Sequence, residues 1–127
     1  MSVAFDSTQG LVIVLAQVYG PTGDTVVRLA LDTGAVGTLI NPVILAAIGY
    51  DLTQISDQIR IVTGSGIENV SRLVLQQIGS LGQTREEFLI TCHSLPAATG
   101  VDGLLGLDFC RGQRLVVDFR AGEVTLD

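Results

Sequence analysis

The stretch Leu-Ala-Leu-Asp-Thr-Gly-Ala at residues 29–35 carries the strongest structural signal in the chain. Three apolar residues, typical of a buried strand, lead directly into Asp32. A carboxylate at the end of a buried strand must be hydrogen-bonded or perturbed, because burial of a free charge is costly. The following Gly34 permits a turn that brings backbone amides toward this carboxylate. For such a triplet taken alone, a plain surface turn is the alternative interpretation.

Short strands joined by tight turns are indicated on both sides of this stretch. The chain contains 15 glycines, and its valine, isoleucine, leucine and threonine residues gather in short runs, a pattern typical of β structure. Hairpins are expected for residues 11–19 with 25–31, 59–63 with 70–78, and 115–119 with 123–126, and a further strand for 88–92. The fold class is therefore expected to be all-β.

Two short helices are expected between these strands. Asn41 and Pro42 suit the N-cap and the first helical position, and Gly49 suits the position just past the last turn. Together they predict a helix over residues 43–48. A second short helix is expected at residues 106–110.

Composition bounds the size of the fold and the available chemistry. The 127 residues, 47% of them apolar, suffice for one core, so a single domain over residues 1–127 is expected. All seven positive charges are arginines, which excludes a Schiff-base lysine and the lysine of a phosphate-binding loop. The single histidine, His93, and the two cysteines, Cys92 and Cys110, lack the spacing of a zinc motif. No metal and no cofactor are expected, and both cysteines are expected to be buried thiols.

Charge and hydropathy restrict partners and compartment. A net charge of −6 would repel a phosphate backbone, so nucleic acid is not an expected partner. The longest apolar run near the N-terminus is residues 11–16, which follows Asp6 and no basic residue, so neither a signal peptide nor a membrane interaction is expected. Two cysteines do not make a disulfide framework. A cytoplasmic location is therefore expected.

Residues 31–35 resemble the active-site signature of the aspartic proteases, in which two such loops meet so that two carboxylates share one proton and hold a water molecule. The triplet Asp-Thr-Gly occurs once in this chain. The chain therefore resembles the retropepsin-like branch of that family, whose single-domain chains each supply one aspartate to a twofold dimer.

Two further segments match this family at similar spacing. Residues 61–66, Ile-Val-Thr-Gly-Ser-Gly, resemble the flap, a hairpin that closes on an extended peptide. Residues 102–108, Asp-Gly-Leu-Leu-Gly-Leu-Asp, resemble the second landmark, in which two apolar residues and a glycine lead into a short helix beside the catalytic loop. Taken alone, the first also suits a surface hairpin tip and the second a strand-to-helix turn. The resemblance covers about residues 10–126.

The resemblance implies a closed acid-protease β-barrel with a flap hairpin and one or two short helices, in a homodimer whose chain ends pair between subunits. It implies an aspartic endopeptidase, a peptide hydrolase in which Asp32 and the same residue of a second chain activate a water. One carboxylate acts as the general base, and the other, protonated, donates to the peptide carbonyl. Like charges at about 3 Å do not ionise together easily, so such a pair favours acid to near-neutral pH.

The resemblance also implies roles for neighbouring residues. Thr33 would brace the two loops across the dimer axis, Gly34 would present its N–H to the carboxylate, and Ala35 would support the same loop. The flap residues expected to bind the substrate backbone are Thr63, Gly64, Ser65 and Gly66. The residues of the second landmark expected to support the site are Leu104, Leu105 and Gly106.

A second hypothesis keeps the acid-protease fold without catalysis. In that case the chain would be a peptide-binding or dimerisation module. A peptide that binds the cleft but is never cut between acid and neutral pH would favour it. Under either hypothesis the expected partners are a peptide or protein and a second copy of the chain.

Overall fold

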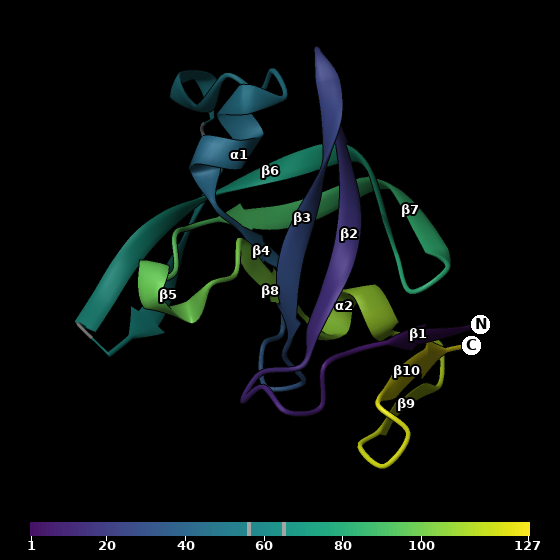
Figure 1. Ribbon diagram of the computed structural model, residues 1–127. Coiled ribbons are helices and arrows are strands. Elements are labelled where there is room, and N and C mark those ends of the chain that lie inside the picture. The colour runs from purple at the N-terminus through teal and green to yellow at the C-terminus, as the bar shows by residue number, and fades with distance from the viewer. Residues whose placement is uncertain (56, 65) are drawn as a thin grey trace.

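The chain folds into a β-barrel, and its N- and C-terminal segments form a small separate sheet (Figure 1). The computed structural model describes residues 1–55, 57–64 and 66–127. The strands are β1 (Ser2–Ala4), β2 (Ile13–Gly20), β3 (Gly23–Leu31), β4 (Leu39–Ile40), β5 (Gln58–Thr63), β6 (Gly66–Ser80), β7 (Gln83–Cys92), β8 (Gly103–Leu105), β9 (Leu115–Asp118) and β10 (Glu123–Leu126). The helical segments are α1 (Pro42–Ala47), α2 (Leu107–Cys110) and the 3-10 turns η1 (Leu52–Gln54) and η2 (Ala97–Thr99).

Six strands close the barrel in the order β2-β3-β8-β4-β7-β6, and β6 returns to pair with β2. β5 pairs with β6 outside this ring and forms a hairpin with it. The β3–β8 and β4–β7 pairs are parallel, and the other pairs of the ring are antiparallel. Closure leaves the ring itself without free edges. The prediction of an all-β barrel with few short helices is confirmed.

Most local predictions agree with the structure. β2 and β3 form the first expected hairpin, and β9 and β10 form the last. Helix α1 begins as expected, because Asn41 Oδ1 accepts a hydrogen bond from the Val43 N–H at 3.0 Å and Pro42 occupies the first turn. α2 is four residues long and lies where the second helix was expected.

β6 and β7 are longer than predicted. The expected strands were residues 70–78 and 88–92, whereas β6 spans 15 residues and β7 spans 10. The polar residues that interrupt the apolar pattern, such as Gln76 and Glu86, lie on the exposed side of these strands. Backbone pairing does not require apolar side chains on a solvent-exposed face of a sheet. The length of β6 follows instead from its pairing with three strands, β2, β5 and β7.

The N-terminal strand β1 was not predicted. It pairs with β10, with Val3 opposite Val124, and β9 covers the other edge of β10. Figure 1 shows the two chain ends side by side in this sheet. The chain ends therefore pair with each other within one chain, and β1 and β9 form the outer edges of this sheet.

The barrel interior is filled by aliphatic side chains and by Phe109 of α2, which is fully buried. Phe109 packs edge-to-face on Phe88 at 5.9 Å between ring centroids. The Arg85 guanidinium lies 4.7 Å from the Phe109 ring centroid, and its Nη2 donates to the Phe109 carbonyl at 2.9 Å. Helix α2, which follows β8 directly, is therefore fixed to β7 by packing and by a charge-assisted hydrogen bond.

Both cysteines are free thiols in the interior, as predicted. Burial raises the pKa of Cys92 and of Cys110 above their usual value. Within the described residues, the helices are all too short or too polar to cross a membrane.

Candidate active site

Asp32 lies directly after β3, at the point where the buried strand reaches the surface. Its backbone N–H donates to the Leu105 carbonyl of β8 at 2.9 Å, which fixes the start of the loop. The Gly34 N–H donates to Asp32 Oδ1 at 2.9 Å, and the Ala35 N–H donates to the Asp32 carbonyl at 3.2 Å. Asp32 is half-buried, while Thr33 and Gly34 are exposed. Residues 32–35 thus form a tight turn in which the Gly34 amide braces the Asp32 carboxylate.

The second half of this loop is tied to α2 through Thr38, which is fully buried. Thr38 Oγ1 donates to Asp108 Oδ1 at 2.7 Å and accepts from the Gly106 N–H at 3.1 Å. The Thr38 N–H donates to Asp108 Oδ2 at 2.9 Å. Sequence reasoning did not assign a role to Thr38 or to Asp108. The available signal was a polar residue inside an otherwise apolar run at residues 35–40.

Gly106 lies against the loop so closely that no side chain fits. A Cβ atom built on Gly106 would lie 2.7 Å from the carbonyl carbon and oxygen of Gly37. The next two amides continue the contact, since the Leu107 N–H donates to the Ala35 carbonyl at 2.9 Å and the Asp108 N–H to the Val36 carbonyl at 3.2 Å. The loop that carries Asp32 is therefore a rigid part of the barrel end.

The structure brings together two of the three residue groups predicted for the site. Leu105 holds the Asp32 amide and Gly106 contacts the loop, as described above. Leu104 lies opposite Leu39 in the β4–β8 pair, and both side chains line the pocket described below. Residues 32–35 and 104–106 thus form one unit.

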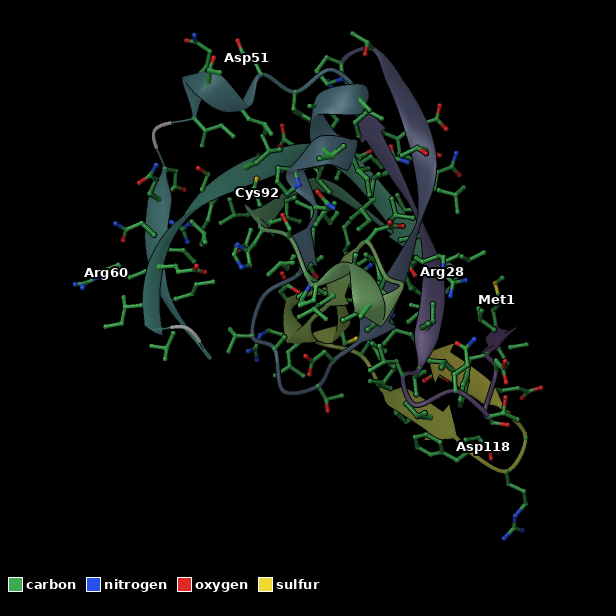
Figure 2. The ribbon with its side chains drawn as sticks, turned by 60° about the vertical axis from the view of Figure 1, so that its left-hand side comes forward. Met1, Arg28, Asp51, Arg60, Cys92 and Asp118 are labelled. Carbon is green, nitrogen blue, oxygen red and sulfur yellow. The ribbon has the colours of Figure 1, made fainter. Side chains whose placement is uncertain are left out.

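The third predicted group lies at the end of the β5–β6 hairpin. Thr63 pairs with Gly66, and Gly64 is exposed between them; Ser65 lies outside the described residues. Figures 1 and 2 both show this hairpin extending away from the barrel. Val62 is 84% exposed and its partner Ile67 is 63% exposed. The hairpin end therefore presents apolar side chains to solvent, which is typical of a surface that contacts a ligand or partner.

A pocket of about 540 Å³ separates the hairpin from the Asp32 loop. We call it the loop–hairpin pocket. Its lining comes from loop and β4 residues 35–39, from β5, from β6 and β7, and from Leu104 and Asp108. Most of the lining side chains are aliphatic, and Asp32 is not among them. Such a volume suits a side chain or a short peptide segment.

The described part of the chain contains no cluster of three or more histidine, cysteine, aspartate or glutamate residues arranged to hold a metal ion. His93, the single histidine, lies with Nε2 at 3.5 Å from Glu68 Oε2. The Asp32 carboxylate itself can bind a water molecule and exchange a proton with it, because the Gly34 N–H holds Oδ1 and the residue stays partly accessible.

The closed barrel carries one Asp-Thr-Gly turn, which is braced by the Gly34 amide and by Gly106 at the start of α2. This combination defines an acid-protease fold. The model of the aspartyl protease family matches residues 17–109, which include this loop, the β5–β6 hairpin and Gly106. The chain therefore belongs to the aspartyl protease family, and its barrel is similar to that of a solved retropepsin-like protease.

A solved structure described as a retropepsin-like aspartic protease from Rickettsia conorii has the same fold. It superposes with a TM-score of 0.69 at 16% sequence identity, and the match covers 99% of this chain and 88% of that one. No curated protein sequence matches the chain significantly.

Proposed function

We propose that this chain is an aspartic endopeptidase that works as a twofold homodimer with one Asp32 from each subunit. The observation that carries the proposal is the Asp32 carboxylate, held by the Gly34 amide at 2.9 Å on a loop that Thr38, Gly106 and Asp108 lock in place. Electrostatic catalysis depends on groups that are already oriented before the reaction. This loop meets that requirement without any ligand.

The proposed dimer follows from the number of carboxylates that the reaction needs. Hydrolysis of a peptide by an aspartate pair requires one base and one acid at the same water molecule. The chain has a single Asp-Thr-Gly loop. A twofold axis beside Asp32 supplies the second loop by symmetry. Thr33 is exposed next to Asp32, where its hydroxyl is free to contact the opposing loop.

In the proposed mechanism, one Asp32 carboxylate removes a proton from the bound water, which attacks the peptide carbonyl carbon. The other carboxyl group, protonated, donates its proton to the carbonyl oxygen, so the total charge of the pair does not change. As the carbon–nitrogen bond breaks, the proton taken from the water passes to the amine nitrogen, and the other carboxylate recovers its proton from a hydroxyl group of the tetrahedral intermediate. The β5–β6 hairpin would act as the flap, pairing with the substrate backbone and excluding water.

The test is the Asp32→Asn variant, assayed on an unbiased peptide library between acid and neutral pH. Loss of the base should lower kcat/KM by roughly 10³-fold or more, with unchanged circular dichroism and melting temperature, because the amide keeps the shape of the carboxyl group. Asp51→Asn is the matched control. Asp51 caps η1 through its side chain, a role that asparagine also performs. Cleavage that survives Asp32→Asn would overturn the proposal, and wild-type binding without cleavage would favour a non-catalytic peptide-binding module.

A further inference from the structure

Among the described residues that line the loop–hairpin pocket, Arg72 of β6 is the one with a cationic side chain. The other charged lining residue is Asp108, but both its oxygens already accept hydrogen bonds from Thr38, and Oδ1 also accepts from the Phe109 N–H. Both Asp108 oxygens are thus occupied by hydrogen bonds from its own loop and helix. Arg72 is therefore the charged group of this lining that can donate hydrogen bonds to an acidic ligand.

The Arg72 guanidinium is held by Asp57 at the start of the hairpin. Arg72 Nη2 and Nε donate to Asp57 Oδ1 at 3.0 and 3.3 Å, and the Arg72 N–H donates to the Asp57 carbonyl at 2.8 Å. The two side chains are 34% and 48% exposed. A solvent-accessible ion pair of this kind contributes little stability, so its partner can be exchanged at low cost.

The guanidinium has further capacity for an acidic ligand. A guanidinium carries five N–H donors in a planar fork that matches a carboxylate. Asp57 takes Nε and Nη2 with a single oxygen, and Nη1 has no hydrogen-bond acceptor in the part of the chain that the structure describes. A second carboxylate entering the pocket would find donors already oriented by the first.

The walls next to Arg72 suit an aliphatic stem. Ile59 and Ile61 of β5 and Leu89 of β7 line the same pocket. A glutamate side chain combines methylene groups with a terminal carboxylate, so it can contact these walls and reach the guanidinium. The protein as a whole carries a net charge of −6 and does not attract acidic peptides at long range. Any preference for glutamate must therefore come from a local cation.

We infer that Arg72 makes this chain selective for substrates with a glutamate side chain in the loop–hairpin pocket. The inference rests on the proposed peptidase function and names its substrate class. Arg72 is a specificity-determining residue in this scheme, because it contacts the substrate and takes no part in the reaction. Asp57 holds the guanidinium in place and competes with the substrate carboxylate for it.

The experiment measures cleavage of peptide pairs that differ only in glutamate against glutamine, with each position around the cut varied in turn. The wild-type chain should prefer glutamate about tenfold in kcat/KM at one position, the size expected for one charge-assisted hydrogen bond near the surface. The preference should appear in KM rather than in kcat, because the contact exists before and during the reaction.

Variants on both sides of the ion pair give opposite expectations. Arg72→Gln should remove the preference, and Arg72→Lys should retain part of it. Asp57→Asn should increase the preference, because the amide oxygen can still accept from the guanidinium while the competing negative charge is gone. Arg60→Gln is the matched control: Arg60 lies between Ile59 and Ile61 on the opposite side of β5, does not line the pocket, and points away from the barrel in Figure 2. A purely structural ion pair would instead lower stability in both Arg72→Gln and Asp57→Asn without changing selectivity.

Binding of the same peptides to the Asp32→Asn chain separates this inference from the proposed function. Cleavage without a glutamate preference, or a preference that survives Arg72→Gln, overturns the inference and leaves the peptidase standing. If no peptide is cut, the proposed function fails, and dissociation constants of the glutamate and glutamine peptides decide the inference. Equal constants, or no binding of either peptide, overturn it. An Arg72-dependent difference of about tenfold supports it.

Discussion

The hydroxyl of Thr38 joins segments that lie 70 residues apart in the chain. It donates to Asp108 and accepts from the amide of Gly106 in a fully buried position. A buried polar group whose partner is removed loses its hydrogen bond without regaining water. The geometry of the Asp32 loop therefore depends on one oxygen atom that does not touch the carboxylate.

Thr38→Val replaces that oxygen with a methyl group of similar size. We expect it to lower the free energy of unfolding by about 1–3 kcal/mol, because the Gly106 N–H loses its acceptor and Asp108 loses a donor. Urea unfolding followed by circular dichroism measures this change. Thr84→Val, at an exposed position on β7, is the control and should stay within about 0.5 kcal/mol of the wild-type chain. Equal stability of the two variants would contradict the stabilising role given to the Thr38 hydroxyl.

Sequence reasoning identified Asp32 and Gly106 but not Thr38, for a physical reason. The backbone turn after Asp32 depends on adjacent residues, so its signal is local. The role of Thr38 exists only when β4 is placed beside β8. Leu81 gives a second example, since it adopts a positive φ of 52° in the β6–β7 turn while 3% exposed. Leucine is not expected in that conformation, and the core contact that holds it is tertiary.

At the scale of secondary-structure elements, the pairing of β2 with β6 closes the barrel, and the Tyr50 side chain adds a hydrogen-bonded link between these two strands. The Tyr50 hydroxyl donates to the Tyr19 carbonyl at 2.6 Å and accepts from the Gln76 N–H at 2.8 Å. Both groups lie at the end of the β2–β6 ladder, where Tyr19 pairs with Gln77. A side chain from the segment after α1 thus supplies the last contact between the two strands.

Tyr50→Phe should lower the free energy of unfolding by about 1 kcal/mol at neutral pH, the net value of a hydrogen bond whose backbone partners remain near solvent. Burial raises the pKa of Tyr50 above 10.0, and the Gln76 hydrogen bond opposes this only in part. At a pH between the two pKa values, Tyr50 keeps its hydroxyl proton in the folded chain and has lost it in the unfolded chain. The contribution is therefore complete below pH 10 and is lost as the pH rises through the folded-state pKa.

Unfolding curves of the wild-type chain and of the Tyr50→Phe variant between pH 7 and pH 11 measure this effect. The stability difference between them should be constant up to about pH 9 and should shrink above pH 10. The chain has no lysine, so tyrosines and cysteines dominate this titration range. The raised pKa values of Cys92 and Cys110 act in the same direction in both chains and cancel in the difference. A difference that grows with pH would contradict this account.

Elements with local signals could be predicted, and elements made by distant pairing could not. The β2–β3 hairpin and α1 follow from turn and capping residues that are adjacent in the sequence. β4 is two residues long and is a strand only because β7 and β8 flank it. The same holds for β1, whose three residues pair with the other end of the chain.

At the scale of the whole molecule, the barrel was predicted from three motifs at residues 31–35, 61–66 and 102–108. The dimer is predicted because the chain has one copy of the Asp-Thr-Gly triplet, whereas the reaction needs two. The barrel was expected from the resemblance of the three motifs to one family, and the structure places these motifs at the ends of β3, β5 and β8. The dimer stays a prediction. The ladder β1-β10-β9 is complete within one chain, so strand pairing between subunits through this sheet would use the outer edge of β1 or of β9.

Mixing two kinds of chain tests whether one site needs two aspartates. Wild-type and Asp32→Asn chains, combined in equal amounts at constant total concentration and allowed to exchange, assemble at random if their interfaces are identical. Only dimers with two wild-type chains contain a complete pair, so activity should fall to about one quarter of that of the wild-type chain alone. Independent sites in each chain would leave about one half, the value that simple dilution predicts. Sedimentation velocity on the same mixture establishes that dimers are present, and an activity of one half in a dimeric sample would show that Asp32 acts without its twofold mate.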